Sequence, residues 1–151
     1  MRKVAARIAV LATLSLLAIP SVASARPWGG QGFNDLGPAY LSLGVNNNGQ
    51  AKVRNVQLIM ACTDAEDGTE SSRAFYARFN NFEALRLNRF DFEFTALSGG
   101  RIGLVRVKGI LRSNGRGAAR AEVIATATGD MGQVVERCQG AARIELRRGP
   151  N

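Results

Sequence analysis

The chain has 151 residues, with 20 basic and 12 acidic side chains and no histidine. This length fits one ordinary domain. The missing histidine excludes Ser-His and Cys-His nucleophile systems and most catalytic zinc sites, because each of these uses an imidazole. The sequence also contains neither a Walker-type phosphate loop nor a dinucleotide-binding fingerprint, so we expect no cofactor.

The first 25 residues have the features of a secretory signal peptide. Positive charges come before an apolar run over residues 8–19, Pro20 follows, and residues 23–25 read Ala-Ser-Ala. The apolar run is shorter than the ~20 residues that span a membrane. We therefore expect cleavage after Ala25, secretion to the periplasm or the extracellular space, and no integral membrane segment in the mature chain.

The mature chain would be only moderately basic. Removing 25 of the 151 residues leaves 126, with 17 basic and 12 acidic side chains and a net charge of +5. Fifteen of these bases are arginines spread along the chain, with Lys52 and Lys108 as the lysines. This distribution favours a solvated surface and argues against nucleic acid, and it leaves an anionic cell-envelope polymer or another protein as the candidate partner.

Cys62 and Cys138 are the two cysteines of the chain. In an oxidising compartment an even count predicts a disulfide. A metal site is the weaker alternative, because two thiolates supply half of a zinc coordination shell and the chain has no histidine to complete it.

Residues 26–38 are rich in glycine and proline and lack periodicity, which predicts a flexible leader. Its aromatics, Trp28 and Phe33, fit a partly docked tail better than a ligand-facing pair. From residue 39 to 148, apolar residues recur at every second position between turn sequences, which is typical of β-strands.

Residues 73–87 are ambiguous. They read either as two strands or as one helix with Phe75, Phe79 and Phe82 on a stripe. Pairing Leu87 with Phe90 across a turn favours strand for 82–87, while a short helix near 73–80 stays open.

The clearest strand pairing surrounds Gly99-Gly100. If these glycines form a two-residue hairpin turn, Phe94 lies opposite Val105 and Phe92 opposite Val107. On the other face the same register pairs acids with bases, Glu93 with Arg106 and Asp91 with Lys108. Because both faces match at once, we predict this register.

A turn at residues 113–117 leads into the next strand. A three-residue loop would place Val123 opposite Val107 and Glu122 opposite Lys108. The predicted polar face is therefore a structural charge ladder, made up of Asp91, Lys108, Glu93, Arg106 and Glu122.

These patterns predict an all-β fold: a single antiparallel β-sandwich or flattened barrel of seven to nine short strands, linked by one disulfide. The predicted organisation is a signal peptide (1–25), the leader (26–38) and the β-sandwich domain (39–148). The cysteine spacing invites comparison with immunoglobulin domains, but the tryptophan between the cysteines and the corner tyrosine of that fold are missing.

Two functions stay open. The first is a secreted, non-catalytic binding or envelope-associated protein whose ligand is an anionic polymer, a glycan or a protein. The second is a small secreted hydrolase that uses carboxylates, but the ladder carboxylates face bases that keep them ionised, whereas a general acid needs a raised pKa. The acidic loop 64–70 resembles a calcium ligand set without the EF-hand spacing. We favour binding and assign no catalytic residue.

The signal peptide predicted for residues 1–25 gives the first testable prediction. Intact-mass measurement of exported protein should give a chain that begins at Arg26. Retention of residues 1–25 would remove the argument for secretion.

Overall fold

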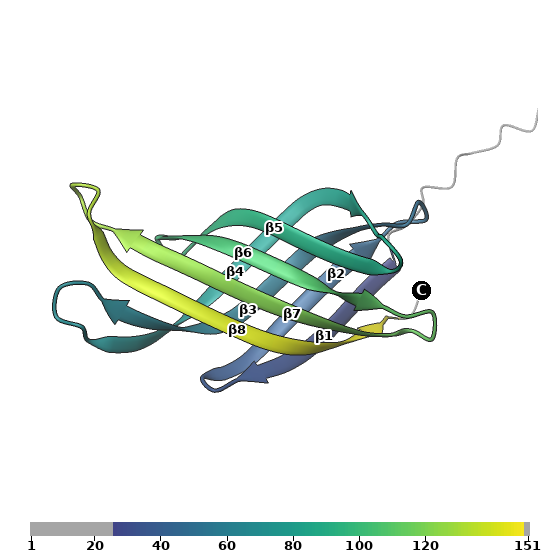
Figure 1. Ribbon diagram of the computed structural model, residues 1–151, viewed down its shortest axis with the longest axis horizontal. Helices are drawn as coiled ribbons and strands as arrows, with labels where there is room; N and C mark the ends of the chain where they lie inside the picture. The colour runs from purple at the N-terminus through teal and green to yellow at the C-terminus, as the bar shows by residue number, and fades with distance from the viewer. Residues whose placement is uncertain (1–25, 150–151) are drawn as a thin grey trace, which may run out of the picture.

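The structure is a computed structural model that describes residues 26–149, so the predicted signal peptide lies outside the described residues (Figure 1). Eight antiparallel strands form one sheet. The strands are β1 (Arg26–Asn34), β2 (Gly37–Val45), β3 (Gln50–Asp64), β4 (Glu70–Ala84), β5 (Arg89–Ser98), β6 (Arg101–Leu111), β7 (Arg116–Thr128) and β8 (Val134–Arg148). The predicted all-β, disulfide-linked fold is confirmed.

The strand order is β4-β3-β2-β1-β8-β7-β6-β5, with an additional pairing of β3 with β8. The short hairpin of β1 and β2 lies between the two long strands at one end of the molecule. Beyond its turn, β3 and β8 pair directly over residues 61–64 and 136–139. The sheet therefore curls on itself as a β-sandwich or flattened barrel, with its halves forming two layers around one core (Figure 1).

The core consists of the inward side of every strand. Along β5 and β6, buried residues such as Phe92 and Val107 alternate with exposed ones. Successive side chains of a strand point to opposite faces of the sheet, so one side of each strand faces the core. At the seam between β4 and β5, the Phe79 ring stacks on Phe94 with centroids 4.8 Å apart. Among the described residues, no polar or charged residue is fully buried.

The prediction of a flexible leader over 26–38 is wrong. Residues 26–34 form β1, which pairs with both β2 and β8 inside the sheet. Its glycines explain the missing alternation: a Cβ on Gly30 or Gly32 would lie 1.8 Å from a backbone oxygen of β8. Trp28 is buried in the core, whereas Phe33 is 72% exposed on the outer face.

The helix considered for residues 73–80 is also wrong, because β4 is one continuous strand from 70 to 84. The predicted pairing of Leu87 with Phe90 is wrong as well. Leu87 and Asn88 form a two-residue turn, with reciprocal backbone hydrogen bonds between Arg86 and Arg89. Both turn residues have positive φ, 52° and 62°, where glycine and asparagine are the usual residues.

The hairpin of β5 and β6 has the predicted register, with Phe94 opposite Val105 and Glu93 opposite Arg106. Gly99 and Gly100, both with positive φ, form its turn.

The next pairing is wrong by two residues: Glu122 lies opposite Arg106 instead of Lys108, and Val123 lies opposite Val105. The loop consists of residues 113–115, since the Arg112 backbone N–H bonds to the Arg116 carbonyl. A shift of two keeps each side chain on its predicted face.

The predicted Cys62–Cys138 disulfide is present and joins β3 to β8 where they pair directly. In the described part of the chain, no helix is long and apolar enough to cross a membrane. Both findings are compatible with a secreted protein.

The tight contact between β1 and β8 gives the second prediction. Gly32→Ala should lower the free energy of unfolding by several kcal/mol, because its methyl group would overlap the Arg143 carbonyl oxygen. Gly29→Ala is the matched control, since a Cβ there meets nothing closer than 3.8 Å. Urea unfolding of both variants should separate them, and equal stabilities would contradict this packing.

Candidate anion-binding face

Six cations form two transverse rows on the outer side of the sheet: five lie on β6, β7 and β8, and Arg112 directly follows β6 and is bonded through its backbone to Arg116. We call them the basic face: Lys108, Arg112, Arg116, Arg120, Arg143 and Arg147. In the first row, Lys108 lies opposite Arg120, and Arg120 lies opposite Arg143. In the second row, Arg116 lies opposite Arg147. All six residues are exposed.

The first row borders an open depression of about 750 Å³. Small residues of β7 and β1, among them Ala118 and Gly32, contribute to its lining beside the three cations. Neighbouring strands are about 4.8 Å apart, so the row presents three positive groups across roughly 10 Å. The depression can therefore receive several acidic oxygens of one ligand at once.

The exposed ring of Phe33 borders the same depression, because Phe33 lies opposite Arg143 in the pairing of β1 with β8. An aromatic ring beside guanidinium groups offers an apolar contact next to the charged ones. The expectation of a partly docked tail is therefore wrong for both aromatics: Trp28 is a core residue of β1, and Phe33 is exposed on the outer face of the same strand.

Like charges directly opposite one another destabilise a sheet. In both rows bases face bases, and no described carboxylate forms an ion pair with Lys108, Arg143 or Arg147. Arg120 differs, because its Nε bonds to Glu122. Glu145 lies between the rows and offsets part of the charge. A bound polyanion would relieve the remaining repulsion.

The residues of the predicted charge ladder adjoin this face. Asp91 lies opposite Lys108, and Glu93 binds Arg106, which raises the pKa of that guanidinium through the hydrogen bond and the charge of Glu93. Glu122 lies opposite Arg106 and bonds to Arg120. The carboxylates of Glu93 and Glu122 thus each accept a hydrogen bond from a guanidinium group.

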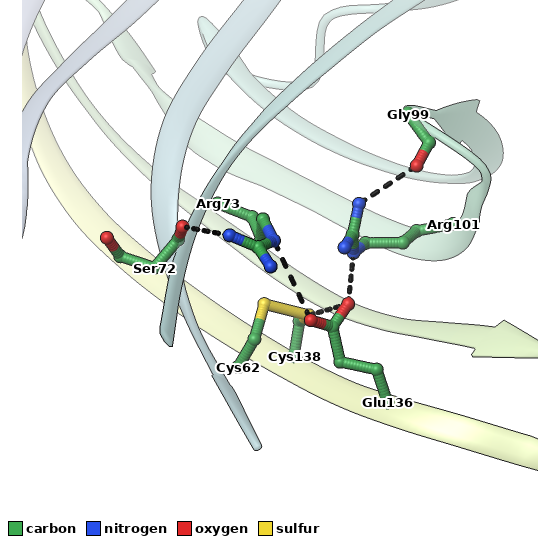
Figure 2. Close-up of polar contacts among 7 residues, drawn as sticks. All are labelled: Cys62, Ser72, Arg73, Gly99, Arg101, Glu136 and Cys138. Carbon is green, nitrogen blue, oxygen red and sulfur yellow. Dashed lines mark hydrogen bonds and ion pairs between the residues drawn. A yellow bond between two sulfur atoms is a disulfide. The ribbon is translucent and has the colours of Figure 1, made fainter. Parts of the chain in front are cut away.

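A second polar cluster lies on the inward side of the sheet, at the end of the molecule that carries the disulfide. Figure 2 shows Glu136 of β8 between Arg101 of β6 and Arg73 of β4, beside the disulfide. Arg101 Nε donates to Glu136, and Arg73 Nε lies 3.7 Å from the other carboxylate oxygen. The Glu136 side chain is 13% exposed, so this ion pair is partly shielded from water.

The same cluster brings ligand atoms of Cys62, Cys138 and Glu136 within 4.8 Å of one another, as a metal site would. Both sulfur atoms are bonded to each other, however, and Glu136 is held by two arginines. A carboxylate oxygen lies 3.6 Å from the Cys138 sulfur, which has no hydrogen to donate. The proximity is accounted for by the disulfide and the ion pair.

In the acidic loop 64–70, two carboxylates accept hydrogen bonds from backbone N–H groups of the loop itself. The Asp64 carboxylate accepts hydrogen bonds from the backbone N–H groups of Glu66 and Asp67. Thr69 donates to Asp67, which lowers the pKa of that carboxyl. Turn formation explains these two carboxylates without calcium.

The protein is a disulfide-linked, single-sheet all-β protein, with six exposed cations on the outer side of β6, β7 and β8 and of the turn after β6. Comparison with known protein families finds no family model that matches this sequence, and no curated protein matches it significantly.

The third prediction compares the partly shielded ion pair of Glu136 with the exposed ion pair of Glu93. Glu136→Gln should lower the free energy of unfolding by about 1–3 kcal/mol, because the partly buried guanidinium group of Arg101 loses its counter-charge and the exposed Arg73 loses its partner. Glu93→Gln is the control and should have little effect, since its pair with Arg106 is exposed. Chemical denaturation measures both, and a larger loss for Glu93→Gln would contradict the assignment.

Proposed function

We propose that this protein is an exported, non-catalytic binding protein whose basic face holds an anionic polymer of the cell envelope. The observation that carries the proposal is the row of Lys108, Arg120 and Arg143 across three neighbouring strands. Arginine binds phosphate and carboxylate groups in a bidentate manner, and a row of such groups suits a repeating acidic ligand.

The shape of the surface supports a polymer over a small molecule. The depression is open, and the second row of cations, Arg116 with Arg147, lies four residues further along β7 and β8, beyond Glu145. Positions four residues apart on one strand are about 13 Å apart, so the two rows offer separate contacts to one extended chain. Several moderate contacts along one chain add up through effective concentration.

The disulfide and the lack of a membrane-spanning helix in the described residues are compatible with export. Export itself rests on the sequence of residues 1–25, which lie outside the described part. The alternative, a carboxylate-dependent hydrolase, is less well supported because Glu93, Glu122 and Glu136 all bond to arginines.

The fourth prediction tests the basic face with long-chain polyphosphate as the probe. The double variant Lys108→Glu, Arg143→Glu should weaken binding by roughly tenfold or more, because two contacts become repulsive. The control Arg78→Glu, Arg137→Glu makes the same change in net charge at exposed positions outside the basic face and should retain most of the binding.

Titration at two salt concentrations completes the test. Affinity of the unaltered protein should fall steeply as salt rises, since polymer counterions are released on binding. Salt-independent binding, or equal losses in the two double variants, would overturn the proposal. Hydrolysis of the probe that ends when one carboxylate is changed to its amide would establish the enzyme instead.

A further inference from the structure

The turn between β4 and β5 has a residue that the turn does not favour. Leu87 and its neighbour Asn88 both lie in the left-handed region of backbone conformation. Two-residue turns of this kind favour Asn-Gly, because a side chain at positive φ crowds its own backbone. Asparagine tolerates this conformation, but leucine rarely adopts it.

The Leu87 side chain also makes no contribution to the core, since it is 91% exposed. Two arginines, Arg86 and Arg89, flank the turn and pair with each other through their backbones. The fold thus holds a projecting leucine between two cations, at the expense of backbone strain. Strain of this kind, kept where folding does not require it, points to a function of the residue.

An open groove of about 1070 Å³ adjoins the turn. Leu87, Phe90 and Ile110 give it apolar walls. Its charged lining consists of three cations and two carboxylates, Arg86, Arg89, Lys108, Glu83 and Asp91, so the groove carries a net positive charge. The turn is held to the sheet, because the Leu111 backbone N–H donates to the Asn88 carbonyl at 2.8 Å. Leu87 is therefore presented on a fixed support beside Lys108, a member of the basic face.

Charge is unevenly distributed along the molecule. The β4–β5 turn lies at the end that carries Arg112, Arg116 and Arg147. The acidic residues of loop 64–70 lie at the opposite end, beside the disulfide (Figure 1). A negatively charged surface would attract the first end and repel the second, so it would select one orientation.

We propose that this end of the molecule docks on a lipid bilayer with anionic headgroups. Leu87 enters the headgroup boundary, and Arg86 and Arg89 bind the phosphates around it. The proposal goes beyond the proposed function, because it adds a lipid surface as a second phosphate-bearing partner, at the end of the molecule next to the basic face.

A single projecting leucine within a group of arginines suits a bilayer better than a protein partner. At a bilayer surface the apolar side chain gains from leaving water, while neighbouring arginines keep their charges among the headgroups. A stable protein interface would need a much larger apolar area, on the order of 1,000 Å² in total.

The test uses vesicles of phosphatidylcholine with roughly one third phosphatidylglycerol, the kind of surface on which basic residues contribute to binding. The disulfide-bonded protein should sediment with these vesicles and not with phosphatidylcholine alone. Leu87→Ser should weaken vesicle binding by roughly tenfold, because it removes the apolar side chain that is proposed to enter the bilayer. The same variant should bind polyphosphate as the unaltered protein does.

Two further variants make the test specific. Leu97→Ser removes a leucine that is 71% exposed near the Gly99-Gly100 turn and should bind vesicles normally. Leu87→Asn should lose vesicle binding while raising the thermal midpoint, since asparagine relieves the strain without unfolding the turn.

The outcomes separate the two proposals. The docking inference is overturned if Leu87→Ser leaves vesicle binding unchanged or if Leu97→Ser weakens it equally. It is also overturned if the protein binds equally well to vesicles with and without anionic headgroups. Polyphosphate binding without any vesicle binding overturns it too and leaves the proposed function standing. Failure to bind either probe removes both.

Discussion

The pairing of β3 with β8, fixed by Cys62 and Cys138, is the constraint on which the rest of the structure depends. These strands belong to different halves of the chain, 76 residues apart at the cysteines, and meet where the β1–β2 hairpin ends. Closing a loop of this length lowers the conformational entropy of the unfolded chain. In the chain-entropy model this stabilises the folded state by about 4 kcal/mol. The same link sets the register of β8, so it also determines where the arginines of β8 lie.

The basic face follows from that register. Arg143 meets Arg120 only because β8 is aligned with β7 as it is. The buried side of the same two strands, with Ala121 opposite Ala142, packs into the core and opposes any slip, since a shift by one residue would expose it. The core and the disulfide thus hold together cations that repel one another. If a polyanion binds here as proposed, the protein loses little conformational freedom on binding, because the strands already hold the cations in place.

The sequence predicts those parts of the fold that follow from local alternation. The hairpin around Gly99-Gly100 was predictable because both of its strands are amphipathic and its charges match. β1 was not, since its glycines have no side chains to alternate and their close approach to β8 appears only in three dimensions. The row on the basic face was missed because Glu122 was aligned with Lys108, which left Arg120 out of that row. Nor does any local signal join Arg101 to Glu136, 35 positions apart.

The two ends of the molecule differ in how their charges are paired. At one end, Glu136 pairs with Arg101 and Arg73 beside the disulfide, and the acidic loop 64–70 lies at the same end. At the other end, cations oppose one another and Leu87 stays exposed on a strained turn. Features that cost stability therefore collect far from the cross-link that compensates for them. A protein built only for stability would place asparagine and glycine in that turn and alternate its charges across the sheet. The departure from both rules at the same end is the physical reason to look for the ligand there.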